Sequence, residues 1–178
     1  QPRLEARDVL VRLREIGLRP LVMLTGDNRG VADAIGKTLG VDEIKADLLP
    51  EDKVSAIQAL MQKHGPLAMI GDGVNDAPAL AQATVGIAMG GAGTGVALET
   101  ADVALMGDDL RTLPFAVGLS RQAARIIRQN LSISMAVIAL LVAATLLGWA
   151  GIGTAVLLHE GSTMVVVANS LRLLAYAE

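Results

Sequence analysis

The stretch from Gln129 to Leu158 contains no charged side chain, and this feature most constrains what the chain folds into. Residues 131–150 are long enough to cross a bilayer as a helix, because about 20 apolar residues suffice. Glycines at 148, 151 and 153 predict a turn, after which residues 154–174 return as a second span. The C-terminal part, residues 130–178, is therefore expected to be a transmembrane α-helical hairpin.

Arginines mark both ends of this predicted hairpin. Arg121, Arg125 and Arg128 precede the first span, in a basic amphipathic connector over residues 111–129, and Arg172 ends the second span. Cytoplasmic flanks of membrane helices are enriched in basic residues, so both ends are expected in the cytoplasm. The sequence thus predicts a multi-pass protein of the cell membrane, with the lipid bilayer as a partner and residues 1–110 cytoplasmic.

Residues 1–110 have a different character. They carry ten basic and sixteen acidic side chains, a net charge of −6, which argues against a nucleic-acid partner. The whole chain has no cysteine, so a disulfide framework or a thiolate metal site within it is excluded.

Strand-like and helix-like segments alternate through the same region. Short apolar runs at 21–24, 43–46, 67–70, 85–89 and 103–106 alternate with helical patterns at 7–16, 29–39, from Pro50 onward and at 77–82. This order predicts an α/β fold with a doubly wound parallel sheet and helices on both faces. Active sites in such sheets lie at the carboxyl ends of the strands, where Thr25-Gly26-Asp27 and Gly71-Asp72-Gly73 fall.

The segment Gly71-Asp72-Gly73-Val74-Asn75-Asp76-Ala77-Pro78 has the composition of a phosphate and metal site. Gly71 and Gly73 let the backbone approach a phosphate, and Pro78 opens a helix whose N-terminus favours an anion. Asp72 and Asp76 are paired carboxylates, which beside a phosphate indicate Mg²⁺.

This segment resembles the hinge motif of P-type cation-transporting ATPases. The order of Thr25-Gly26-Asp27, Lys53, Asp72 and Asp76 resembles their haloacid-dehalogenase-like (Rossmann-like) phosphorylation domain, and residues 92–106 resemble the heavy-metal branch. The resemblance implies ATP as substrate and an aspartyl-phosphate intermediate. It further implies that Lys53 and Mg²⁺ on the two aspartates stabilise the phosphoryl group, while Thr25 and Asn75 orient it.

The family's phosphorylated aspartate lies in an Asp-Lys-Thr-Gly-Thr motif, which this sequence lacks. The resemblance therefore implies the C-terminal part of the phosphorylation domain and the last two membrane helices. ATP would be bound mainly by a domain absent from this chain, and the remainder of the ATPase is an expected partner. We expect the polypeptide alone to be inactive.

A polar cluster, His159-Glu160-Gly161-Ser162-Thr163, interrupts the second predicted span. A charge at the bilayer centre costs roughly 2.5–3.5 kcal/mol on insertion scales, so its default interpretation is functional. His159, Glu160 and Thr163 share one helix sector, and their nitrogen and oxygen atoms suit a divalent transition metal. The cluster resembles the last-helix signature of cobalt-type heavy-metal ATPases, which implies Co²⁺, Zn²⁺ or Fe²⁺ as cargo. A hydrogen-bond cluster between helices is the alternative.

Two further polar positions are interpreted as structural. Asn169 is expected to bond a neighbouring helix, and Asp102 to be a structural cap or a surface group.

Two other functions stay open at this stage. A membrane-anchored phosphatase of the haloacid-dehalogenase-like superfamily would release phosphate from small phosphomonoesters. A non-catalytic fragment would bind metal or associate with a full-length transporter. We favour a part of an ATP-driven pump for divalent heavy-metal cations.

Overall fold

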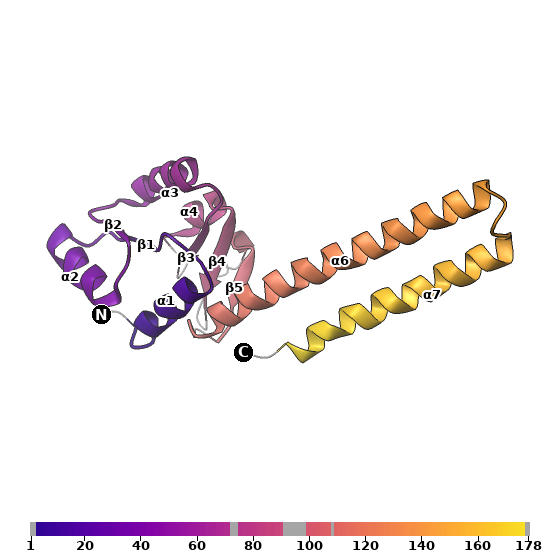
Figure 1. Cartoon of the computed structure of the whole chain (residues 1–178). Helices are drawn as coiled ribbons and strands as arrows, with labels where there is room; N and C mark the ends of the chain where they lie inside the picture. The colour runs from indigo at the N-terminus through magenta and orange to yellow at the C-terminus, as the bar shows by residue number, and fades with distance from the viewer. Residues whose placement is uncertain (1–2, 72–74, 91–98, 108, 177–178) are drawn as a thin grey trace. The chain divides into compact units, whose positions relative to one another are not determined.

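The structure is a computed structural model, and it describes residues 3–71, 75–90, 99–107 and 109–176. The chain forms two compact units, Gln1–Pro114 and Phe115–Glu178. The first unit contains the strands and the short helices, and the second is a helical hairpin (Figure 1).

The elements follow the predicted alternation closely. The helices are α1 (Ala6–Glu15), α2 (Arg29–Leu39), α3 (Pro50–His64), α4 (Ala77–Gln82), α6 (Thr112–Leu146) and α7 (Ile152–Leu171), with the 3-10 helix η1 (Arg172–Ala175) at the end. The strands are β1 (Val22–Leu24), β2 (Glu43–Lys45), β3 (Ala68–Gly71), β4 (Val85–Met89) and β5 (Val103–Leu105).

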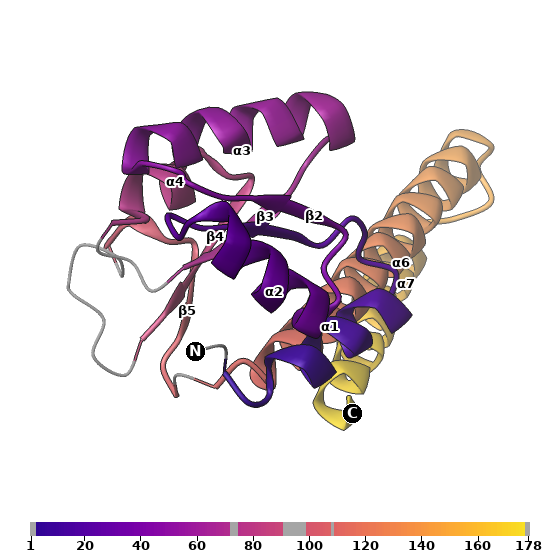
Figure 2. The same cartoon turned by 90° about the vertical axis from the view of Figure 1, so that its left-hand side faces the viewer.

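All recorded strand pairs are parallel, as expected for an α/β fold, but they form two sheets. β1 pairs with β2, and β3, β4 and β5 pair in that order. The predicted parallel α/β arrangement is confirmed, and its strands are divided into a two-stranded and a three-stranded sheet. In Figure 2, α3 lies on one side of the strands and α1 and α2 lie on the other, so helices cover both faces.

Local sequence signals explain the helix ends. The side chain of Asn28 accepts a hydrogen bond of 3.0 Å from the backbone N–H of Val31, which caps α2. Gly40 ends α2 with a φ of 73°, a left-handed conformation that glycine adopts without a steric penalty. Pro50 begins α3 at a position where a missing N–H costs nothing.

A small aliphatic core joins α3, α4 and β3. Ile57, Met69, Ala79 and Leu80 are buried together, and Leu24 of β1 packs against them. A Cβ at Gly86 would lie 2.7 Å from the carbonyl oxygen of Leu80, so glycine permits the close approach of α4 to β4. This core fixes the ends of α3 and α4 that bear the candidate site.

Asp102 holds β4 to the segment before β5. Its carboxylate accepts a 2.8 Å hydrogen bond from the N–H of Gly86, and its own N–H donates to the carbonyl of Gly86 at 2.9 Å. The structural role expected of Asp102 is confirmed.

The basic connector and the first predicted span form one helix, α6. No glycine or proline occurs between residues 119 and 146, so nothing in the sequence breaks it. Among the helices of the described residues, α6 alone has the length and composition of a membrane span. The polar His159, Glu160 and Asn169 lower the hydropathy of α7, and its membrane crossing remains a prediction.

Side-chain amides join the two helices of the hairpin. Asn169 Nδ2 donates to Asn130 Oδ1 at 2.8 Å and to Gln129 Oε1 at 3.3 Å. Asn130 Nδ2 donates in turn to Ser170 Oγ at 2.8 Å. The prediction that Asn169 bonds a neighbouring helix is confirmed.

An aromatic contact fixes the open end of the hairpin. The rings of Phe115 and Tyr176 have centroids 5.6 Å apart. A Cβ at Gly118 would overlap the Tyr176 hydroxyl, so glycine makes room for the tyrosine.

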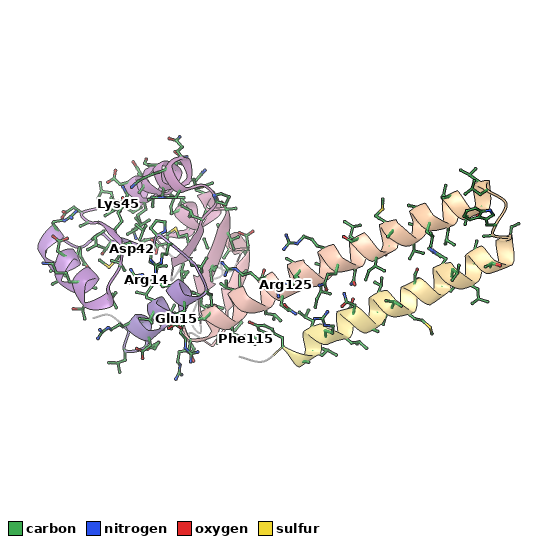
Figure 3. The ribbon with its side chains drawn as sticks, viewed as in Figure 1. Arg14, Glu15, Asp42, Lys45, Phe115 and Arg125 are labelled. Carbon is green, nitrogen blue, oxygen red and sulfur yellow. The ribbon has the colours of Figure 1, made fainter. Side chains whose placement is uncertain are left out.

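Asp42 connects three segments of the N-terminal unit. One carboxylate oxygen accepts a 2.7 Å bond from the N–H of Leu21, and the other lies 2.7 Å from the Arg14 guanidinium (Figure 3). The Leu21 hydrogen bond and the nearby Arg14 charge hold the pKa of Asp42 below its usual value of 3.8 against the opposing effect of desolvation. The contact anchors the start of β1, which leads to Thr25.

Replacing Asp42 by Asn is expected to destabilise the N-terminal unit by roughly 1 kcal/mol at neutral pH, because a partly exposed, charge-assisted contact is lost. The folded-state pKa is lowered, so the contribution of the carboxylate is present above pH 3.8 and is lost as the pH falls through the folded-state pKa. The measurement is urea unfolding of the whole chain, followed by hydrogen exchange of the β1–β2 amides at several pH values.

The matched control is Asp33→Asn, which removes an exposed pair with Arg29 within α2. We expect it to cost under about 0.5 kcal/mol. Equal effects of the two substitutions would contradict an anchoring role for Asp42.

Candidate functional site

The candidate site is built on the carboxyl ends of β1, β2 and β3. The loop after β1 carries Thr25-Gly26-Asp27, the segment after β2 leads into α3 with Lys53, and the segment after β3 leads to Asp76. Parallel pairing aligns the ends of β1 and β2, and Leu24 of β1 packs against the core that contains Met69 of β3.

The loop after β1 is closed by its own side chains. Thr25 Oγ1 accepts a 3.1 Å hydrogen bond from the N–H of Asp27 and donates to Asp27 Oδ2 at 3.2 Å. The hydroxyl is thus held at the end of β1, beside the exposed residues Gly26 and Asp27. Such an arrangement suits the oxygen atoms of a phosphoryl group.

Backbone hydrogen bonds tie this loop to the segment that precedes α3. The N–H of Asp47 donates to the carbonyl of Asp27 at 2.9 Å, and that of Leu48 donates to the carbonyl of Thr25 at 3.1 Å. A Cβ at Gly26 would lie 3.1 Å from the carbonyl oxygen of Leu48, so glycine allows this close approach. The threonine loop and the start of α3 therefore form one connected framework.

Lys53 lies in the first turns of α3. Asp52 Oδ2 accepts a 3.0 Å bond from the N–H of Leu49, the residue that caps this helix. Lys53 Nζ lies 2.5 Å from Asp76 Oδ1, and the two side chains are only 16% and 15% exposed. The low exposure makes this pair stronger than a typical surface salt bridge, because the surrounding solvent screens it less.

Asp76 stands at the N-terminus of α4, directly above the end of β3. A Cβ at Gly71 would lie 2.9 Å from Asp76 Oδ2, so the missing side chain of Gly71 leaves space for the carboxylate. The ion pair uses Oδ1, and Oδ2 faces Gly71. A carboxylate oxygen at the end of a strand is a ligand that fits Mg²⁺.

The structure brings together two groups of the predicted site residues. Lys53, Asp76 and Gly71 form one group, and Thr25, Gly26 and Asp27 form the other. Asn75 is exposed next to Asp76. Asp72 and Gly73 lie outside the described residues.

The polar cluster of α7 has a different setting. His159, Glu160 and Thr163 are exposed, while Ser162 is partly buried toward the hairpin partner. Thr163 Oγ1 and Ser162 Oγ both donate to the carbonyl of His159, at 3.3 and 2.7 Å. Within the described part of the chain, no group of three or more His, Cys, Asp or Glu side chains is placed to hold a metal. His159, Glu160 and Thr163 therefore lie on an exposed face of α7.

Two contacts were not predicted from the sequence. The Arg14–Asp42 pair joins residues 28 positions apart, and no local pattern indicates it. The partners of Asn169 were likewise unknown, although an amide in an apolar helix is itself a signal for a polar contact between helices.

Comparison with known proteins identifies relatives over nearly the whole chain. Residues 1–84 match the family model of haloacid dehalogenase-like hydrolases. The cadmium-transporting ATPase of Staphylococcus aureus is 48% identical over 169 residues, which cover 95% of this chain and 23% of the relative. The zinc-transporting ATPase of Bacillus subtilis is 49% identical over 174 residues, covering 98% of this chain and 27% of the relative.

A solved structure matches both sequence and fold. The crystal structure of a zinc-transporting PIB-type ATPase in the E2.Pi state has a TM-score of 0.90 and 48% identity, and the match covers 98% of this chain and 28% of that one. This chain thus spans about a quarter of the length of the relatives it matches. It contains a haloacid dehalogenase-like domain and is homologous, over nearly its whole length, to a part of the heavy-metal-transporting P-type ATPases.

Proposed function

We propose that this chain works as part of an ATP-driven pump for divalent heavy-metal cations, in which a phosphoryl group passes through an aspartyl-phosphate. The observation that carries the proposal is the Lys53–Asp76 pair at the end of β3, in a chain homologous to such pumps. An amine and a carboxylate at a strand end suit phosphoryl transfer, where catalysis depends on positioning and charge.

Each residue of the site has a distinct role in this proposal. The ammonium group of Lys53 faces the negative charge of the transferring phosphoryl group. The Thr25 hydroxyl and the side-chain amide of Asn75 orient its oxygens. Asp76, together with Asp72, would hold Mg²⁺, which when bound neutralises charge on the phosphoryl group. Asp76 also keeps Lys53 at the strand end, because their atoms are already 2.5 Å apart.

The aspartate that accepts the phosphoryl group belongs, in this proposal, to another segment of the pump. β1 and β3 each have one edge for which the structure records no strand partner among the described residues. Leu24 of β1 nevertheless packs on the core that contains Met69 of β3. This arrangement supports a strand from elsewhere in the pump completing the sheet beside the site.

The transported cation is proposed to pass His159, Glu160 and Thr163 on α7. Their exposed position supports a site completed by further membrane helices, with alternating access driven by phosphorylation. The sequence pattern favoured Co²⁺, Zn²⁺ or Fe²⁺, whereas the relatives described above are named for zinc and cadmium. We therefore favour Zn²⁺ or Cd²⁺ as cargo.

α7 is proposed as the second membrane span, with the α/β unit in the cytoplasm.

A chimera tests the phosphoryl-transfer role. This chain would replace the matching quarter of the Bacillus subtilis zinc-transporting ATPase, and zinc-stimulated ATP hydrolysis would be measured in purified membranes. We expect the chimera to be active and Lys53→Ala to reduce turnover roughly 100-fold, because one charge that stabilises the transferring group is lost.

The matched control is Lys63→Ala, on the same helix. Lys63 is 61% exposed and pairs with Glu43 at 3.2 Å, far along α3 from the site. Its substitution should change turnover less than twofold. An inactive wild-type chimera, or equal losses for the two lysines, would argue against the proposal.

The same chimera tests the cation site. Glu160→Gln keeps the shape of the side chain and removes its charge, so we expect loss of zinc-stimulated phosphorylation and of zinc binding. Phosphorylation of the aspartate by inorganic phosphate, which needs no transported cation, should be retained. Ser170→Ala on the same helix is the control. Normal zinc stimulation in Glu160→Gln would refute the assignment.

The phosphatase alternative makes an opposite prediction for the chain by itself. A stand-alone phosphatase would release phosphate from p-nitrophenyl phosphate in the presence of Mg²⁺. We expect no release above that of a Lys53→Ala variant, because the chain lacks the Asp-Lys-Thr-Gly-Thr motif. Lys53-dependent turnover of the isolated chain would favour the phosphatase.

A further inference from the structure

An open groove of about 520 Å³ lies on the hairpin near its open end, remote from the turn between α6 and α7. Arg125 and Arg128 line it from α6, and Arg172 lines it at the end of α7. Gln129 and Asn169 add amide groups, and Ile133 gives it an apolar wall. The groove belongs neither to the phosphoryl site nor to the polar cluster around Glu160.

The three guanidinium groups donate to neutral acceptors. Arg125 donates to Gln122 Oε1 at 3.1 Å, Arg128 to the carbonyl of Ala124 at 3.3 Å, and Arg172 to Asn169 Oδ1 at 2.9 Å. These contacts leave the positive charges uncompensated. Glu160 is the one acidic side chain in the described part of this unit, and it lies twelve residues before Arg172. At 1.5 Å per residue this separation is about 18 Å, well beyond direct pairing.

The amide network holds the groove in shape. Asn169 accepts from Arg172 through Oδ1 and donates through Nδ2 to Asn130 and Gln129 of α6. Arg172 is therefore fixed relative to the helix that carries Arg125 and Arg128. A fixed set of planar donors suits the oxygens of a phosphate, which guanidinium groups bind in a bidentate way.

The length of α6 indicates the level in the bilayer at which the groove lies. Its 35 residues extend about 52 Å, whereas the hydrocarbon core of a bilayer is about 30 Å thick. The charge-free stretch begins at Gln129, directly after Arg128, so the arginines lie where the apolar part of the helix begins. In an inserted hairpin this is the level of the lipid head groups. Leu131 and Met135 are exposed next to it, on the side where acyl chains would run.

We propose that this groove binds the phosphate-bearing head group of an anionic glycerophospholipid. Basic grooves between membrane helices on the cytoplasmic side are suited to such head groups, because charge attraction and apolar contact act together. The proposal rests on the membrane insertion of the hairpin proposed above. It adds a site for a specific lipid class, separate from both the ATP chemistry and the cation.

Native mass spectrometry of the purified whole chain in detergent tests the proposal. Dioleoylphosphatidylglycerol is titrated against dioleoylphosphatidylcholine, and inorganic phosphate is tested alone. We expect one molecule of phosphatidylglycerol to bind in preference to phosphatidylcholine. Arg125→Gln, Arg128→Gln and Arg172→Gln should each weaken it about fivefold, since one basic residue near the surface contributes roughly 1 kcal/mol.

Arg121→Gln is the matched control, because it removes the same charge from the same helix outside the groove. A loss under twofold in this variant separates a built site from diffuse attraction. Equal losses in all four variants, equal binding of the two lipids, or arginine-dependent binding of inorganic phosphate without lipid preference would each overturn the proposal.

Alkaline carbonate extraction of membranes containing the chain keeps the two proposals distinguishable. A chain that resists extraction but shows no lipid preference overturns the lipid site and leaves the membrane hairpin standing. A chain released by carbonate overturns both.

Discussion

The Lys53–Asp76 ion pair is the contact on which the geometry of the N-terminal unit depends. It joins the first turns of α3 to the N-terminus of α4, with both side chains about 15% exposed. Loss of either partner would leave the other charge largely desolvated, which is far more costly than loss of a surface pair. Gly71 makes room for the carboxylate, and the core of Ile57, Met69 and Leu80 fixes the two helices below it. The ion pair that joins the two helices is therefore formed by the same side chains that the proposed function places in the phosphoryl site.

Such an ion pair suits a site that binds and releases a phosphoryl group and a cation. Without a phosphoryl group, the charges of Lys53 and Asp76 neutralise each other. An incoming phosphoryl group and a cation would each offer one member of the pair an opposite charge, and charge balance would be kept. The Thr25 loop is coupled to the same framework through the bonds of Asp47 and Leu48. In the proposed function, the site would therefore alternate between two charge arrangements on one hydrogen-bonded framework.

Local signals in the sequence predicted the elements, and the long-range contacts lay beyond them. Helix ends are marked by residues with particular backbone chemistry, here Asn28, Gly40 and Pro50. The bounds of α2 and the start of α3 can therefore be predicted from the amino-acid sequence. The strand pattern placed Thr25-Gly26-Asp27 and Gly71-Asp72-Gly73 at strand ends, and Lys53 was added by the family resemblance. The direct Lys53–Asp76 ion pair needs the packing of α3 on α4. The division into two sheets depends on which strands pair, and periodicity carries no information about that.

The polar side chains of the hairpin differ in whether they have hydrogen-bond partners within it. Asn130 and Asn169 are hydrogen-bonded to each other between the helices, so their partial burial carries little cost. The hydroxyls of Ser162 and Thr163 donate hydrogen bonds to the carbonyl of His159 within the same helix. Glu160 has no comparable way to satisfy a charge within its own helix. If α7 crosses a bilayer as proposed, a carboxylate on its exposed face needs another polar group or a cation beside it, and in the proposed function further helices of the pump would supply that partner.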